Sequence, residues 1–366
     1  MLIPFYGIKR FYEKNSADIL NLLNSVYVKG QIFGDEILSL EKELAAYFER
    51  RFAVTAGSCT DALFFALKAG RIKEGDEVLV SSFSFIASAS CITRIGAVPI
   101  FVDIDPDTFL MDMEDLKKKI TPKTKAIIGV HLFGQSFDIH AVDKIAKQHN
   151  ILFIEDAAQG FGSISGKTKA GSLGKISCLS FDPTKVISAF GSGGAMLTDD
   201  DNIYRQLLKY KYHGKSTDND YEIQGYNSRL SAAQCALLSY QLKEHLSDRH
   251  TRLRQIAERY NNELAAVKEL ILPFEIPENY HIYHKYVIRT DERNGLSGNL
   301  KKNGISTMIH YPKPLNQYSL FHNKPFRAEN ITTCSKICSE VLSLPIYPEL
   351  TDEEIMFICK SIKSFF

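Results

Sequence analysis

The sequence predicts an α/β protein with a large domain built on a mostly parallel sheet and a smaller C-terminal α+β domain. Its 366 residues exceed what a single hydrophobic core usually holds, so two domains are expected. Between about residues 50 and 200, short apolar runs alternate with amphipathic stretches. Apolar strands separated by helices are typical of a parallel sheet covered by helices on both faces.

The predicted strands of this sheet are short runs rich in Val, Ile, Leu and Phe. They cover residues 52–55, 77–80, 98–102, 126–130, 151–154, 176–179 and 195–198. Helices are predicted between them, for example at 60–69 and 139–148. Ligands of such sheets bind just beyond the carboxyl ends of the strands. We therefore expect the functional residues directly after the strands.

The second part of the chain has a different pattern. Residues 201–270 are charged and helical, with long amphipathic stretches at 231–244 and 252–267 that link the two domains. Beyond them, short strands are predicted at 283–288 and 305–309, and helices near 331–341 and 352–364. These patterns predict a large domain over residues 1–245 and a smaller domain over residues 246–366.

Composition excludes several functional classes. Apolar residues make up 45% of the chain and charged residues 24%, and the net charge is +1. This balance provides no excess of positive charge that would attract nucleic acid or an anionic membrane. No apolar run approaches the roughly 20 residues that cross a bilayer, and the first residues do not form a signal peptide. We expect a cytoplasmic protein without nucleic-acid or membrane partners.

The seven cysteines include no Cys-x-x-Cys pair, and their number is odd. A zinc site at Cys334 and Cys338 would need histidines at suitable spacing, and none is near. We therefore expect buried free thiols in a reducing compartment and no metal site.

Residues 180–185, with the sequence SFDPTK, place Lys185 on a short turn between two apolar strands. The turn continues into the glycine-rich residues 191–194. Burial favours the free amine of a lysine, and only the free amine attacks a carbonyl, so Lys185 is a candidate Schiff-base nucleophile. Most lysines that follow a strand are surface cations, and the motif alone leaves that interpretation open.

Three further segments after strands are suited to binding a cofactor. Residues 56–60 open a helix whose free amides suit a phosphate, with the Ser58 and Thr60 hydroxyls as added donors; a plain helix N-cap is the alternative. Phe85 is suited to stacking on a flat ring, although such residues commonly belong to the core. Asp156 follows an apolar strand and needs a partner, either a protonated ring nitrogen or, as an N-cap, helix amides.

Together these features are what a pyridoxal phosphate site requires. The lysine holds the cofactor covalently, the helix end binds its phosphate and the aromatic ring stacks on it. The aspartate keeps the pyridine nitrogen protonated, so that the ring withdraws electrons from the substrate.

Nine segments in chain order carry a resemblance to a known family. They are GQIFG at 30–34, TDAL at 60–63, GDEV at 75–78, VDID at 102–105, HLFGQ at 131–135, EDAAQ at 155–159, the lysine motif, GYNSRL at 225–230 and HYP at 310–312. With these motifs the chain resembles the DegT/DnrJ/EryC1/StrS family of nucleotide-sugar aminotransferases over nearly its whole length. The resemblance implies the type I fold of pyridoxal phosphate-dependent transferases, which is aspartate aminotransferase-like.

The resemblance also implies roles for individual residues. Lys185 would be the Schiff-base lysine and proton shuttle, and Asp156 would pair with the pyridine nitrogen. Gln159 would bind near the ring hydroxyl, and Phe85 would stack on the ring. The phosphate would be held by Ser58, Cys59, Thr60 and Ser180. Asn227 would reach the phosphate across the interface of a homodimer, and the nucleotide-sugar would meet Arg229, His310 and Tyr311.

For the reaction, the resemblance implies transfer of an amino group from L-glutamate, which leaves as 2-oxoglutarate, to a UDP- or dTDP-linked keto-sugar. Residues 310–316 look closer to members that act on 3-keto sugars, and the product would serve amino-sugar and surface-glycan biosynthesis. A C4 aminotransferase acting on a 4-keto-6-deoxy sugar and a non-catalytic regulatory relative are the alternatives. The retained Lys185 argues against the family's 3-dehydratases, in which a histidine replaces it.

The chain departs from the family pattern at three positions. Asp182 stands where an aromatic residue or histidine is usual, Ser192 replaces an acidic residue, and Cys59 replaces a glycine in the phosphate turn. Each departure lies beside the expected site, so each is expected to bear on substrate preference.

Overall fold

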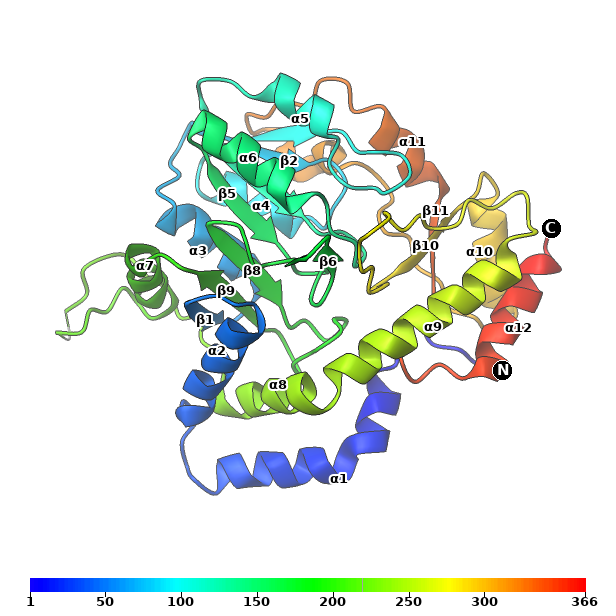
Figure 1. The fold of residues 1–366 in the computed structure, drawn as a ribbon, viewed down its shortest axis with the longest axis horizontal. Coiled ribbons are helices and arrows are strands. Elements are labelled where there is room, and N and C mark those ends of the chain that lie inside the picture. The colour runs from blue at the N-terminus through cyan, green and yellow to red at the C-terminus, as the bar shows by residue number, and fades with distance from the viewer. Residues whose placement is uncertain (219) are drawn as a thin grey trace.

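The computed structural model describes residues 1–218 and 220–366 and is built around a seven-stranded sheet (Figure 1). In spatial order the strands are β1 (Phe52–Ala56), β9 (Gly194–Thr198), β8 (Ile176–Ser180), β5 (Leu152–Asp156), β4 (Thr124–Val130), β2 (Glu77–Ser81) and β3 (Val98–Val102). Strand β9 is antiparallel to both its neighbours, and the pairs from β8 to β3 are parallel. The prediction of a mostly parallel α/β sheet is confirmed.

The strands form where the apolar runs predicted them, because both faces of the sheet are covered. All five residues of β2, β8 and β9 are buried. Two hydrophobic clusters fill the interior, one around β2, β3 and β4 and the other reaching from β8 and β9 to the C-terminal helices. The parallel order brings the carboxyl ends of β2, β4, β5 and β8 to the same edge of the sheet.

Helices follow the strands in alternation, as expected from the sequence. They are α3 (Cys59–Ala69), α4 (Ala87–Arg94), α5 (Met113–Lys119), α6 (Ile139–His149) and α7 (Asp201–Lys211). Several begin at a side chain that accepts hydrogen bonds from the first-turn amides, which fixes where the helix starts: Ser58, Asp112, Asp138 and Asp200. The N-terminal helices α1 (Ile8–Tyr27) and α2 (Asp35–Tyr47) pack on α8 (Ala232–Glu244).

The C-terminal region surrounds a two-stranded antiparallel sheet of β10 (Tyr286–Arg289) and β11 (Val341–Leu344). Its helices are α9 (Leu246–Leu264), α10 (Arg293–Lys302), α11 (Thr333–Glu340) and α12 (Asp352–Lys363), with single 3₁₀ turns at Leu315–Gln317 and Ser319–Phe321. A small hairpin, β6 (Ile164–Ser165) and β7 (Thr168–Lys169), lies beyond β5. The long α9 runs from below the central sheet to this region (Figure 1).

Two strand predictions in this region need correction. Residues 305–309 form no strand: Ile305 bridges to Ile3 and Met308 to Ser343, so the segment meets a different neighbour at each end and no continuous ladder forms. The strand predicted from 283 begins only at Tyr286, because Tyr283 has a positive φ of 49° that extended backbone excludes. The division into domains at residues 245 and 246 stays a prediction.

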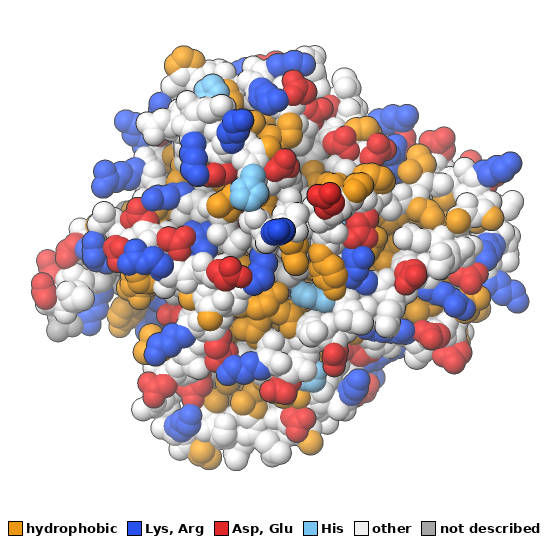
Figure 2. All heavy atoms as spheres, in the orientation of Figure 1, with side chains coloured by type: hydrophobic (Ala, Val, Ile, Leu, Met, Phe, Trp, Pro, Cys, Tyr) orange, Lys and Arg blue, Asp and Glu red, His pale blue; other side chains and the backbone are white. Residues whose placement is uncertain are grey.

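The surface and the cysteines agree with the composition. Figure 2 shows Lys and Arg interspersed with Asp and Glu on the viewed face. In the two described ranges no helix is long and apolar enough to cross a membrane, and no cluster of three potential metal ligands occurs. All seven cysteines are buried free thiols, as predicted.

Candidate active site

A cavity of about 480 Å³ opens at the carboxyl-terminal edge of the central sheet. Residues that directly follow or end the strands line it, as the fold class requires. From the predicted set, the cavity brings together Ser58, Cys59, Thr60, Phe85, Asp156, Gln159, Ser180, Lys185, His310 and Tyr311. Two predicted residues, Asn227 and Arg229, lie outside it.

Lys185 lies in the loop between β8 and β9, half-buried, with its side chain on the cavity. The alternative of a solvated surface cation is therefore wrong. Burial lowers the pKa of Lys185, while the thiol of Cys59 and the carboxylates of Asp182 and Asp156 oppose that shift. A lysine with a lowered pKa offers the free amine that attack on a carbonyl needs.

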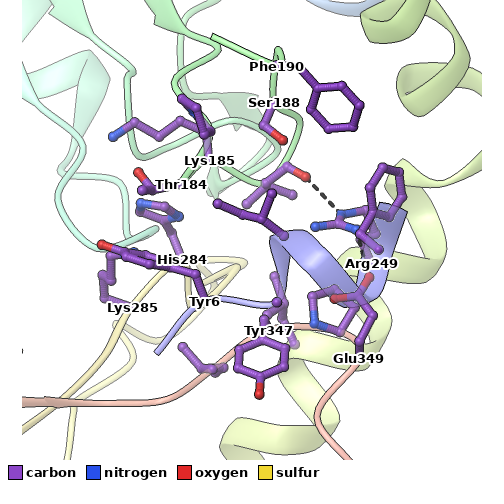
Figure 3. A pocket seen from close by; sticks show the side chains of 18 residues that line it. Tyr6, Thr184, Lys185, Ser188, Phe190, Arg249, His284, Lys285, Tyr347 and Glu349 are labelled. Atoms are coloured by element: carbon purple, nitrogen blue, oxygen red, sulfur yellow. Dashed lines mark hydrogen bonds and ion pairs between the residues drawn. The ribbon is translucent and has the colours of Figure 1, made fainter. Parts of the chain in front are cut away.

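Two helices hold the loop that carries Lys185. From α8, Gln241 donates to the Ser188 carbonyl at 2.7 Å and accepts from the Ser188 amide at 3.1 Å. From α9, Arg249 donates through Nε to the Val186 carbonyl at 2.8 Å and pairs through Nη1 with Glu349 at 3.2 Å (Figure 3). These contacts fix the backbone that directly follows the lysine and so help to place its amine.

Asp182 has a local role that the family pattern did not suggest. Its Oδ1 accepts from the amide of Thr184 at 3.0 Å and from the Thr184 hydroxyl at 2.6 Å. An aspartate that accepts from a residue two positions on stabilises a turn. Asp182 thereby shapes the turn that leads into Lys185, and it also lines the cavity.

Asp156 ends β5 at the floor of the cavity and is 3% exposed. Ser88 donates its hydroxyl to Oδ2 at 2.7 Å, and the amide of Ala158 donates to Oδ1 at 3.2 Å. No helix begins here in the described chain, so the helix N-cap alternative is wrong. Burial raises the pKa of Asp156, which shows that its present partners do not fully compensate the ionised form.

Glu155, the residue before Asp156, bonds the end of β5 to His131 and to residues 171–177. Sequence reasoning missed this structural role. Glu155 is fully buried and pairs with Nε2 of His131 at 2.9 Å. It also accepts from three backbone amides and one hydroxyl, those of Gly171, Leu173, Gly174 and Ser177. Burial raises the pKa of Glu155, but the hydrogen bonds outweigh burial and lower it to about 2.

The N-terminus of α3 forms the opposite end of the cavity. Ser58 caps the helix by accepting from the Asp61 amide at 3.1 Å, so the N-cap interpretation is correct, and Ser58, Cys59 and Thr60 also face the cavity. Strand β9 approaches this turn closely at Gly194. A Cβ on Gly194 would lie 2.5 Å from the amide nitrogen of Cys59, so only glycine fits there.

The remaining wall comes from segments far away in the sequence. Gln159 accepts from the Phe133 amide and donates to the Tyr311 hydroxyl, both at 3.2 Å, which connects the sheet edge to the C-terminal region. His310 contacts the Ser343 hydroxyl at 2.8 Å. Phe85 is 56% exposed and lines the cavity, so it is no core residue and remains available for stacking.

Asn227 and Arg229 lie elsewhere on the surface of the subunit. The Arg229 guanidinium lies 3.9 Å from the ring centre of Phe33 and 4.3 Å from that of Tyr212. Its Nε donates to Oδ1 of Asn227 at 3.4 Å. Within this chain, neither residue lines the cavity that holds Lys185.

The residues of the cavity wall that sequence reasoning missed include Tyr6, His284 and Lys285. Lys285 had a detectable signal, because it is a charged residue inside the apolar run from 283 to 288. Tyr6 had none, since its position depends on the pairing of the N-terminal residues with residues 304–306.

The strand order of the sheet and the cavity at its carboxyl-terminal edge define the class: this is an aspartate aminotransferase-like fold. The model of the DegT/DnrJ/EryC1/StrS aminotransferase family matches residues 13–363, and the chain belongs to this family. The resemblance of the motifs is thereby confirmed.

Individual relatives cover almost the entire chain. A protein of Geobacillus stearothermophilus named "Pleiotropic regulatory protein" is 37% identical over 100% of this chain and 99% of its own. The UDP-2-acetamido-2-deoxy-3-oxo-D-glucuronate aminotransferase of Pseudomonas aeruginosa is 34% identical over 99% of each chain. The crystal structure of NtdA from Bacillus subtilis with bound cofactor PMP is similar with a TM-score of 0.91 at 30% identity, covering 100% of this chain and 85% of that one.

The polar groups of the cavity fit pyridoxal phosphate. Asp156 is a buried carboxylate whose pKa is raised by burial, and a protonated pyridine nitrogen would be a fitting partner for its ionised form. The end of α3 provides free amides for a phosphate, and Gly194 keeps β9 close to that turn. The amine of Lys185 lies in the same cavity.

Proposed function

We propose that this protein is a pyridoxal phosphate-dependent aminotransferase that moves an amino group from L-glutamate to a nucleotide-linked 3-keto-sugar. One observation carries the proposal: Lys185, with a lowered pKa, shares one cavity with the buried Asp156 in a chain of an aminotransferase family. The 3-oxo group in the name of the Pseudomonas relative supports amination at C3.

When bound, the cofactor supplies a carbonyl that takes up the amino group and a ring that withdraws electrons from the reacting carbon. The amine of Lys185 removes the proton from Cα of glutamate, and in the second half-reaction it delivers a proton to C3 of the sugar. Overall, the C–N bond of glutamate breaks, a C–N bond at C3 of the sugar forms, and 2-oxoglutarate leaves. Asp156 holds the ring nitrogen, and the end of α3 holds the phosphate.

A homodimer with shared sites completes the proposal. Asn227 and Arg229 lie outside the cavity of their own subunit, so they can serve a site only on a second copy. Exposed apolar side chains of the segment 27–33, whose Phe33 contacts Arg229, support such an interface, because monomers rarely expose a contiguous apolar patch: Tyr27, Val28, Ile32 and Phe33. We place the enzyme in the cytoplasm, where UDP- or dTDP-linked sugars would be aminated for polysaccharide synthesis.

A regulatory role is the second candidate, because one relative bears a regulatory name. The cavity argues against loss of catalysis, since Lys185, Asp156 and Gln159 all line it. The purified protein should therefore absorb visible light with pyridoxal phosphate and be trapped by borohydride. A protein that stays colourless and cannot be trapped would leave only the regulatory role.

The decisive experiment determines the position of the new amine. The enzyme is incubated with L-glutamate and a panel of 3-keto and 4-keto nucleotide sugars, and the products are examined by NMR. We expect an amine at C3. Formation of 4-amino products alone would establish the C4 alternative instead.

A further inference from the structure

Lys285 is a buried basic residue on the cavity wall that the proposed mechanism does not use. It immediately precedes β10, is 7% exposed and lines the same cavity as Lys185. Figure 3 shows Lys285 with its neighbours His284 and Tyr6 on the side of the loop that carries Lys185. Lys285 therefore lines the cavity that the proposed function assigns to the substrates.

The amine of Lys285 lies against two aromatic rings, whose faces attract its charged form. The Nζ atom lies 4.7 Å from the ring centre of Tyr6 and 5.5 Å from that of Phe5. Among the residues that the structure describes, no carboxylate forms an ion pair with it. Burial lowers the pKa of Lys285 to about 7; the charge of Lys185 adds to the shift and that of Asp182 opposes it.

The other basic side chains nearby do not replace Lys285 as a cation. Burial lowers the pKa of His310 to about 3 and that of His284 well below its ordinary value, so both histidines are neutral near pH 7. The described lining of the cavity contains no arginine and two lysines. Because the proposed function commits Lys185 to the cofactor, Lys285 is the basic group of this lining left for a substrate, and a bound carboxylate would favour its charged form.

The substrates of the proposed reaction bring anions into this cavity. L-glutamate carries two carboxylates, and a uronic sugar carries one at C6. A carboxylate that leaves water is stable only with a charged or hydrogen-bonding partner. A buried lysine without an acidic partner and a substrate carboxylate without a cation are complementary.

We propose that Lys285 binds a carboxylate of the substrate and so selects carboxylate-bearing substrates for this site. The inference rests on the proposed function and adds to it the residue that recognises a substrate carboxylate. Two substrates could bring such a carboxylate: the amino donor, and a sugar with a carboxylate at C6.

Equilibrium binding to the cofactor-loaded enzyme tests the proposal without turnover. Glutarate represents the donor, because it has both carboxylates but no amino group. UDP-glucuronate and UDP-glucose form a pair that differs only in the C6 carboxylate. Dissociation constants are measured by calorimetry for the wild type, Lys285→Met, Lys285→Gln and Lys285→Arg. Lys118→Met on α5 removes the same charge from an exposed position and is the matched control.

Lys285→Met keeps the apolar stem against Tyr6 but removes the charge. If Lys285 binds the amino donor, we expect Lys285→Met to raise the dissociation constant of glutarate at least tenfold. If Lys285 binds the sugar, the dissociation constant of UDP-glucuronate should rise at least tenfold and that of UDP-glucose should not change. Lys285→Gln should behave like Lys285→Met, whereas Lys285→Arg should restore most of the affinity, and Lys118→Met should match the wild type. Unchanged constants for glutarate and UDP-glucuronate in both neutral variants would overturn the proposal and leave Lys285 a structural residue on Tyr6.

The result can be separated from a failure of the proposed function. If the enzyme aminates no keto-sugar, glutarate binding still reports on Lys285, because it requires no reaction. If transamination proceeds while the glutarate and UDP-glucuronate constants are unaffected by Lys285→Met, only the carboxylate proposal fails.

Discussion

The two walls of the cavity are built in different ways. One wall consists of residues that end or directly follow the parallel strands, such as Asp156, Ser180 and Lys185, and it carries the groups expected to hold the cofactor. The other wall combines Tyr6, Lys285 and Tyr311, which come from both ends of the chain. The first wall is an intrinsic product of the sheet, whereas the second forms only when distant segments pack. The proposed function thus places cofactor chemistry and substrate recognition on separate parts of the fold.

The largest expected effect lies on the first wall. Lys185→Ala should lower turnover by about 10³-fold or more, because no other amine on this wall can serve as nucleophile and proton carrier. Steady-state rates measure the loss. In the wild type, borohydride reduction followed by peptide mapping should label the peptide that contains Lys185. A label on Lys285 would instead show that the lysine bonded to the cofactor lies on the second wall.

Asp156→Asn should lower kcat by about 10²- to 10³-fold, because an amide cannot balance the charge on a protonated ring nitrogen. Rapid-mixing measurement of the glutamate half-reaction isolates the step. Ser88→Ala removes only the hydrogen bond to Asp156 and should cost about tenfold or less. Equal losses in the two variants would show that orientation, not charge, is the contribution of Asp156.

Glu155→Gln should reduce the free energy of unfolding by about 2–3 kcal/mol, since an amide cannot accept all the bonds that converge on this carboxylate. The folded-state pKa of about 2 lies below the ordinary value of 4.5, so the ionised group stabilises the fold above pH 4.5. That contribution is lost as the pH falls from 4.5 to 2. Denaturant titrations at pH 7, 4.5 and 3 test this. A variant that loses stability on acidification as steeply as the wild type would contradict the assignment.

The smallest expected effect concerns the contact between the walls. Tyr311→Phe removes the hydrogen bond from Gln159 and should cost about 1 kcal/mol, or roughly fivefold in kcat/KM for the sugar. The glutamate half-reaction should change less, because the cofactor groups of the first wall stay in place. Rates of the glutamate and the sugar half-reactions, measured separately in Tyr311→Phe and the wild type, test this difference. An equal loss in both would assign Tyr311 to the cofactor.

The first wall could be predicted from the sequence because its chemistry follows a local rule. Residues after apolar strands meet at one edge of a parallel sheet, so Ser58, Asp156 and Lys185 could be brought together without knowing the packing. The choice between the alternatives for Asp156 needed the structure, because it depends on whether a helix follows residue 156.

The second wall was predicted only in part. His310 and Tyr311 were found through the family resemblance, and both line the cavity. Tyr6 and Lys285 were missed, since their neighbours are set by contacts between the N-terminal and C-terminal segments. The predicted strand at 305–309 failed for the same reason: its apolar residues meet Ile3 at one end and Ser343 at the other. The hydrophobic pattern of a segment does not reveal that its two ends pair with different parts of the chain.

The pairing of the first residues with residue 304 has a consequence for how the protein is made. The amide of Ile3 donates to the Gly304 carbonyl at 2.8 Å, and the Ser306 amide donates to the carbonyl of Ile3 at 3.0 Å. During translation, the N-terminal segment must therefore wait until about 300 further residues have left the ribosome before its side of the cavity can close. The nascent chain can assemble the lysine-bearing sheet edge earlier, but the wall that includes Tyr6 can close only after residue 306 has been made.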